Sequence, residues 1–236
     1  YREVYDQAIE RIRNNIDDAA AYCVLAKIAA DHNNSTKALE LFKKASALAP
    51  DNEYCHAYYA QMLSLSGDQI RAKHQADDCA ELTVADHHIA DMLGVVYTRT
   101  GFHDLAVPWF KKAVALKPDI ANYHYNLGAS LQFIGDFDKA NTAYQACLAL
   151  DSNNYRALAS MAQLKKQGAD TPLLYQLKSA FSKATNDTNA QLHLGHAIAK
   201  CLEDVGDYSS SLDWLNKAKA GKKEPSTAVN FKDIVA

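Results

Sequence analysis

Apolar and small residues return along this chain at helical spacing, and the whole arrangement repeats every 34 residues. Glycines stand one period apart at Gly67, Gly101 and Gly135. The recurring small or aromatic positions within a period lie three and four residues apart, which places them on one face of a helix. Each period therefore predicts two helices joined near the glycine, because glycine can end a helix in a left-handed cap.

The repeats can be numbered by taking Ala19, Glu53, His87 and Ala121 as position 1 of four successive periods. Positions 8 and 20 are then small residues, and positions 24 and 27 are aromatic or small. We expect positions 8 and 20 to face each other where the two helices cross, since small residues allow helix axes to approach closely. Position 8 holds Ala26, Ala60, Gly94 and Gly128; position 20 holds Ala38, Ala72, Ala106 and Ala140; position 24 holds Phe42, Ala76, Phe110 and Tyr144.

This register resembles the tetratricopeptide repeat, a helix–turn–helix unit with a period of 34 residues. The residues that carry the resemblance best lie in the third period: Leu93, Gly94, Tyr97, Gly101, Ala106, Phe110, Ala113 and Pro118. The resemblance implies an all-α fold, a right-handed solenoid of about six repeats, in which each repeat packs on its neighbours. It also implies a protein that binds other proteins or peptides.

The two ends of the chain depart from the regular pattern. Residues 1–18 are expected to form the second helix of a truncated N-terminal repeat, and residues 19–154 four complete repeats. An irregular repeat covers 155–188, with a helix start at Thr171 and Pro172, because proline suits the first turn of a helix. The last repeat is expected at 189–223 and a linker toward a missing C-terminal domain at 224–236.

Composition narrows the functional classes. The net charge of −3 comes without a basic stripe, so we expect no nucleic-acid partner. No apolar run is long enough for a membrane span, and we expect no membrane partner. The five cysteines form no CxxC pair and include Cys79 and Cys147 at position 27, where they act as small hydrophobes. This use of cysteine favours a reducing compartment, and we expect the cytoplasm.

The sequence contains no arrangement of residues that indicates catalysis. It lacks a phosphate-binding glycine loop, a nucleophile elbow and an HExxH motif. His87 with His88, and His193 with His196, are the best candidates for a metal site, but no carboxylate or thiol completes a set of ligands. We therefore expect no enzyme activity, no metal and no cofactor in this chain.

The surface of the first helices is the candidate binding site. By resemblance to the family, positions 2, 5, 6, 9, 12 and 13 of each first helix line the inner wall of the solenoid. Tyrosines supply rigid contact area and amides can bond a peptide backbone, which suits an extended protein segment. The candidates are Lys27, Tyr54, Tyr58, Gln61, His88, Asp91, Arg99, Asn122, Tyr125, Asn126 and Gln132.

The C-terminal part resembles the last repeat of bacterial tetratricopeptide-repeat sulfotransferases. The matching segments are residues 192–194, 197–208, 215–219 and 222–223, with a departure at Ala218-Lys219-Ala220, where that family has Gly-Asn. The resemblance implies that the chain is the N-terminal non-catalytic region of such an enzyme and recruits or orients the acceptor. The cofactor 3′-phosphoadenosine 5′-phosphosulfate is then expected only in a domain after Ala236.

Two alternatives to the sulfotransferase context stay open. The chain can instead be a free-standing repeat adaptor in protein assembly or secretion. Within the sulfotransferase context, self-association of the repeats is a further mode of interaction. It can also be the helical arm of another transferase, such as a protein glycosyltransferase. The last alternative predicts a ladder of asparagines at position 6, whereas this chain has Val24, Tyr58, Met92 and Asn126 there.

Overall fold

The computed structural model describes residues 2–168 and 171–220, which form thirteen α-helices and no strand. The linker expected at 224–236 and the last residues of the final repeat lie outside this range. The all-α fold predicted from the sequence is confirmed, with the chain built as an all-α helical repeat solenoid. The helices divide into two compact units, residues 1–150 and 151–236, each described separately below.

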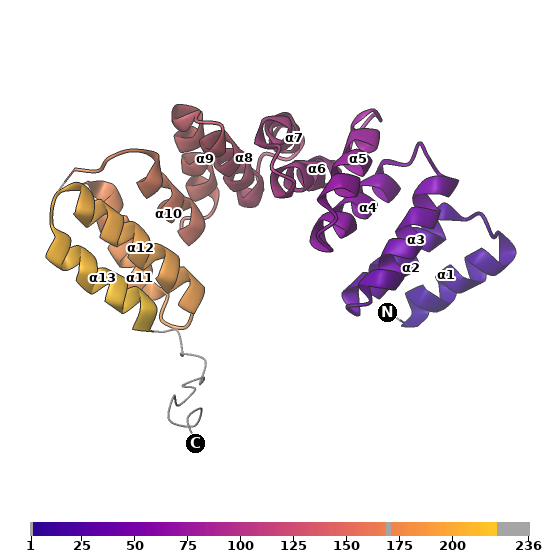
Figure 1. The fold of residues 1–236 in the computed structure, drawn as a ribbon, viewed down its shortest axis with the longest axis horizontal. Helices are drawn as coiled ribbons and strands as arrows, with labels where there is room; N and C mark the ends of the chain where they lie inside the picture. Colours follow the sequence, from indigo (N-terminus) through magenta and orange to yellow (C-terminus); the bar gives the residue numbers. More distant parts are fainter. Residues whose placement is uncertain (1, 169–170, 221–236) are drawn as a thin grey trace, which may run out of the picture. The chain divides into compact units, whose positions relative to one another are not determined.

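The first unit contains nine of these helices, which follow one another from α1 to α9 (Figure 1). After α1 (Arg2–Asn14), the helices form four pairs: α2 (Ala19–Asp31) with α3 (Ser35–Leu48), α4 (Glu53–Leu65) with α5 (Gln69–Ala80), α6 (His87–Arg99) with α7 (His103–Leu116), and α8 (Ala121–Phe133) with α9 (Phe137–Leu150). The helices of each pair pack on each other, and the first helix of one pair packs on the first helix of the next. Within residues 1–18, where a truncated repeat was expected, the structure has the single helix α1.

Turns between paired helices use the residues that the sequence indicates. Gly67, Gly101 and Gly135 all have positive φ, at +89°, +87° and +82°. After Gly67 and Gly135, an aspartate caps the next helix: Asp68 accepts a hydrogen bond from the Arg71 N–H at 3.1 Å, and Asp136 accepts one from the Lys139 N–H at 3.4 Å. These caps satisfy N–H groups that have no partner within the helix.

Two of the helix crossings are packed tightly around position 8. A Cβ atom placed on Gly94 would lie 2.5 Å from Cε1 of Phe110, and one placed on Gly128 would lie 2.7 Å from the Tyr144 ring. In these two repeats, position 8 is a glycine because the aromatic ring of position 24 lies over it. The sequence analysis did not predict this contact, and its expectation that positions 8 and 20 face each other stays a prediction.

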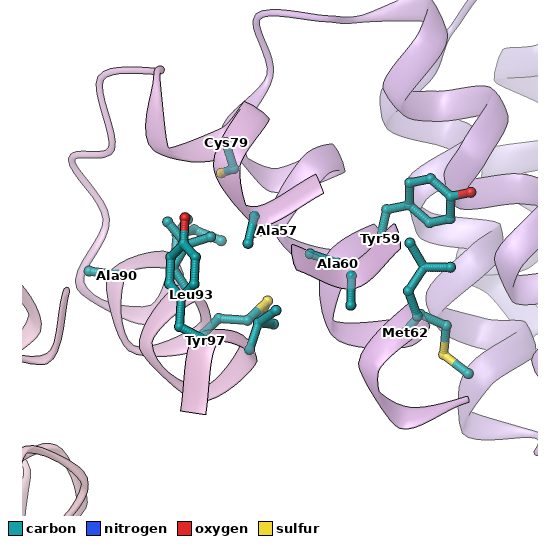
Figure 2. Packing of buried hydrophobic residues seen from close by; sticks show 14 of the residues in the cluster. Ala57, Tyr59, Ala60, Met62, Cys79, Ala90, Leu93 and Tyr97 are labelled. Atoms are coloured by element: carbon teal, nitrogen blue, oxygen red, sulfur yellow. The ribbon is translucent and has the colours of Figure 1, made fainter. Parts of the chain in front are cut away.

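One hydrophobic core runs along the first unit from Ala26 in α2 to Tyr123 in α8. Figure 2 shows part of it, with Ala57 and Ala60 of α4 beside Leu93 and Tyr97 of α6. Cys79, at position 27, is completely buried in this core, as expected of a small hydrophobe. The core fixes the spacing of the first helices and so positions the surface that they share.

The second unit contains α10 (Tyr155–Leu164), α11 (Pro172–Lys183), α12 (Thr188–Asp204) and α13 (Tyr208–Ala220). The last two form a tight pair, since a Cβ on Gly195 would overlap the Cβ of Ala218. The irregular repeat at 155–188 contains a short α10 and α11, and α10 packs more extensively on α12 than on α11. Among the residues that the structure describes, no helix is long and apolar enough to cross a membrane.

Candidate functional site

The surface shared by α2, α4, α6 and α8 is called the first-helix face here. Neighbouring first helices pack directly on each other, so residues one period apart come close in space. Eleven residues on these helices were predicted as ligand contacts from the sequence. Three of them, Lys27, Tyr58 and Gln61, lie together in one pocket at the junction of the first two repeats.

This pocket, the first-helix pocket, has a volume of about 370 Å³. Its lining mixes apolar and aromatic side chains with a cation, a carboxylate, a hydroxyl and two amides. A bulky side chain would fit such a space, since pockets of this type combine apolar walls with a few polar groups that fix orientation. The lining consists of Lys27, Ala30, Asp31, Asn33, Ser35, Phe42, Tyr58, Gln61, Met62 and Leu65.

Tyr58 is held in place at the wall of the pocket. Its ring stacks on Phe42 with centroids 6.1 Å apart and planes within 4°. The Lys27 Nζ atom lies 4.5 Å from the centroid of the Tyr58 ring and donates a hydrogen bond to its hydroxyl at 3.2 Å. These contacts restrict the tyrosine before any ligand arrives, which lowers the entropy cost of binding.

The rim near α3 depends on a left-handed turn. Asn33 has a φ of +58° and occupies the place that glycine holds in the next three repeats. Asn34 then caps α3, with its side chain accepting a hydrogen bond from the Lys37 N–H at 3.2 Å. Asparagine tolerates this conformation better than most residues, so the turn forms and places Asn33 and Ser35 at the pocket.

Farther along the face, two predicted contact residues bond to each other. The Asn126 Nδ2 atom donates to the Asp91 carboxylate at 2.9 Å, and Asp91 is only 9% exposed. Burial raises the pKa of Asp91, while the hydrogen bond from Asn126 and the nearby His88 and His87 act in the opposite direction. The hydrogen bond between Asn126 and Asp91 therefore joins α6 to α8.

Other predicted residues also bond within the protein. The Tyr54 hydroxyl donates to Asp86 at 2.7 Å, which raises the pKa of Tyr54 and lowers that of Asp86. Gln132 accepts a hydrogen bond from the Tyr144 hydroxyl at 2.8 Å. The remaining predicted residues are His88, Arg99 and Asn122, which are exposed, and Tyr125, which is half-buried with its ring 5.9 Å from that of Tyr144.

Some features of this face were missed by the sequence analysis. The hydroxyls of Thr98 and Ser130 lie 3.2 Å apart, and the Sγ atoms of Cys23 and Cys55 lie 2.7 Å apart, each across the junction of two first helices. Thr98 and Ser130 are 32 residues apart, as are Cys23 and Cys55. A search at this spacing, rather than at one full period, would have found both pairs.

Neither a metal centre nor a histidine site forms from the predicted candidates. Nowhere in 2–168 and 171–220 do three or more His, Cys, Asp or Glu side chains gather as metal ligands. The His87 ring instead contacts Tyr123, with Nδ1 2.8 Å from its hydroxyl. His193 packs near Tyr155, with ring centroids 5.9 Å apart.

Comparisons with known proteins agree with this geometry. Residues 121–154, and separately 19–52 and 88–120, match the family described as Tetratricopeptide repeat. A curated relative, anaphase-promoting complex subunit 3 of Schizosaccharomyces pombe, is 24% identical over 159 residues, which cover 67% of this chain. The chain spans only 23% of the length of that protein.

Two solved structures share the fold. YrrB, described as a tetratricopeptide-repeat protein with an unusual peptide-binding site, aligns with a TM-score of 0.61 at 17% identity and covers 87% of this chain and 96% of its own. PilF of Pseudomonas aeruginosa aligns with a TM-score of 0.64 at 18% identity and covers 92% of this chain and 95% of its own.

The fold and the packed first-helix face define the class: an all-α helical repeat solenoid of the kind that presents a surface to other proteins. More particularly, three segments of this solenoid match the tetratricopeptide repeat, and the intervening pair of α4 and α5 is built in the same way.

Proposed function

We propose that this chain is a protein-interaction module that binds an extended peptide segment across the first-helix face. The observation that carries the proposal is the first-helix pocket of about 370 Å³, in which Lys27, Tyr58 and Gln61 lie beside the apolar side chains of Phe42, Met62 and Leu65. The pocket would accept one bulky apolar or aromatic side chain of the peptide. Gln61, with both an amide donor and an acceptor, would bond the adjacent peptide backbone.

The remaining exposed groups extend this surface along later repeats. Arg99 and Asn122 lie on α6 and α8, on the same succession of first helices, and are exposed. A peptide anchored in the first-helix pocket would pass these groups in an extended conformation. The bonded pair of Asp91 and Asn126 would then act as part of the wall rather than as a direct ligand contact.

The test is a peptide selection followed by substitution of Tyr58. Peptides selected from a random library on the purified chain should share a bulky apolar residue, and Tyr58→Ala should weaken their binding roughly tenfold or more, as for a buried aromatic anchor. Isothermal titration calorimetry measures the change. Tyr175→Ala is the matched control, because Tyr175 in α11 is 64% exposed and lies in the other unit.

The proposal fails if no peptide is selected, or if Tyr58→Ala and Tyr175→Ala bind a selected peptide equally well. Circular dichroism of both variants must give the helix content of the parent chain, so that a loss of binding reports on the pocket itself.

For the context of the module, we propose the non-catalytic region of a sulfotransferase, in which the repeats recruit or orient the acceptor. The support is the sequence resemblance over residues 192–194, 197–208 and 215–219. A free-standing scaffold is the alternative, and it is equally consistent with the fold. Translating the natural reading frame and measuring binding of 3′-phosphoadenosine 5′-phosphosulfate to its product distinguishes the two: binding supports the sulfotransferase, and its absence supports the scaffold.

A further inference from the structure

Two cysteine thiols meet at the junction of the first two repeats. Cys23 lies in α2 and Cys55 in α4, and their Sγ atoms are 2.7 Å apart. Cys55 is 1% exposed, whereas Cys23 is half-buried and reachable from solvent. A disulfide bond is about 2.05 Å long, so a shift of a fraction of an ångström would bring the two sulfurs to bonding distance.

The register of the repeats explains why these thiols meet. Cys23 is at position 5 of the first repeat and Cys55 at position 3 of the second. At the next junction the same two positions hold Ala57 and Ile89, and at the third they hold Asp91 and Tyr123. Burial and then the charge of Asp91 raise the pKa of Tyr123, which is consistent with the same adjacency there. Only the first of these three junctions places two thiols together.

The environment of this pair differs from that of other buried cysteines. Burial raises the pKa of the Cys79 thiol to about 12, and its Sγ donates to the Glu53 carbonyl at 3.3 Å. Burial also raises the pKa of Cys201. In the pair, by contrast, the hydrogen bond from Cys23 lowers the pKa of the Cys55 thiol, because it stabilises the thiolate, while the same bond and then burial raise the pKa of Cys23.

We propose that Cys23 and Cys55 form a redox-modification site, which closes to an intramolecular disulfide when a hydroperoxide reaches it and reopens with a thiol reductant. In the first step the thiolate of the pair attacks a peroxide oxygen, the O–O bond breaks, and a sulfenic acid and hydroxide form. In the second step the other sulfur attacks the sulfenic sulfur. The S–O bond breaks, the thiol proton goes to the departing hydroxyl group, and water leaves.

The disulfide would act on the first-helix pocket. Lys27 follows Cys23 by one helical turn in α2, and Tyr58 follows Cys55 by about one turn in α4. A covalent bond between α2 and α4 would hold these two pocket residues at a fixed separation. The bond would also prevent the first repeat from separating from the second. In addition, it would stabilise the folded chain, because a cross-link restricts the unfolded chain.

The experiment uses the fully reduced chain, treated with hydrogen peroxide under native conditions and then analysed by thiol counting and peptide mapping. The expected result is a fall from five free thiols to three and a linked peptide pair containing Cys23 and Cys55. Dithiothreitol should restore all the thiols, and the oxidised chain should melt at a higher temperature than the reduced one.

Matched variants separate this result from general oxidation. Cys23→Ala introduces at position 5 the residue type that the second repeat already has there, Ala57. Cys55→Ala introduces at position 3 the residue type that the first repeat already has there, Ala21. Neither variant should gain thermal stability on oxidation. Cys79→Ala introduces at position 27 the residue type that other repeats have there, as Ala45 and Ala113. This variant should still form the disulfide between Cys23 and Cys55. The proposal is overturned by an unchanged thiol count, by a link between two chains, or by a disulfide that forms only in urea.

Discussion

At the scale of single residues, the turn between paired helices needs a left-handed backbone. Gly67 has a φ of +89°, and a Cβ atom added to it would meet no other atom within 4 Å, so the conformation rather than space restricts the side chain there. We expect Gly67→Ala to cost about 1–2 kcal/mol, the usual penalty for this conformation. Gly67→Asn should cost less, because Asn33 already adopts a φ of +58° at the equivalent position.

Urea denaturation followed by circular dichroism measures both variants. Asn33→Gly is the reciprocal control and should leave the midpoint almost unchanged. Equal losses for Gly67→Ala and Gly67→Asn would contradict the conformational explanation, since the two residues differ mainly in their tolerance of a positive φ.

Residue-level prediction from the sequence was good wherever a side chain has one structural role. Glycines in turns and small residues at helix crossings could be predicted because each repeat imposes the same restriction. The contact between Gly94 and the Phe110 ring could not, because it depends on the angle at which the helices cross. Surface groups were harder still: Asp91 and Asn126 were both suitable for binding a peptide, yet they bond to each other.

At the scale of secondary-structure elements, one aspartate connects α12 to the segment after α10. Asp204, whose side chain is 16% exposed, accepts hydrogen bonds from the Gln167 N–H at 2.8 Å and from the Lys200 Nζ at 2.6 Å. Burial works to raise its pKa, but these hydrogen bonds and the charge of Lys200 hold it below the usual value. The clamp therefore favours the ionised carboxylate.

We expect Asp204→Ala to destabilise the second unit by about 1–3 kcal/mol, because the Gln167 N–H loses its acceptor in a buried setting. A carboxyl group with a lowered pKa in the folded state contributes stability above its unfolded pKa, and this contribution is lost as the pH falls through the folded pKa. Denaturation at neutral pH and during stepwise acidification should thus show that the free energies of unfolding of the parent chain and of Asp204→Ala become equal in acid. The exposed Asp213→Ala is the control, and a pH-independent difference would contradict the clamp.

The elements themselves were predictable to different degrees. Helices in residues 19–150 follow from the repeated pattern, because every period specifies the same two helices and the same turn. The short α10 and its extensive packing on α12 were only partly predictable. The sequence predicted an irregular repeat at 155–188, but the way helices pack across such a break depends on tertiary contacts that no local pattern specifies.

At the scale of the whole first unit, stability should be shared between neighbouring repeats. Gly94→Leu would place a side chain where the Phe110 ring lies, since even a Cβ there would come within 2.5 Å of it. Overpacking of this kind typically costs about 1–3 kcal/mol. Because the core is continuous from α2 to α8, the loss should spread from α6 and α7 to α4, α5, α8 and α9, and reach α1 least.

Hydrogen exchange followed by mass spectrometry would map this spread. Phe110→Ala supplies a matched second variant, because the second repeat already combines Ala60 with Ala76 at the same two positions. Combined with Gly94→Leu, it should give a smaller loss than the sum of the two single changes, as expected for side chains that compete for one space. Exchange that increases only in α6 and α7 would mean that each repeat is stable by itself. The first-helix face would then be a row of independent surfaces, and a peptide bound at one junction would not stabilise the next.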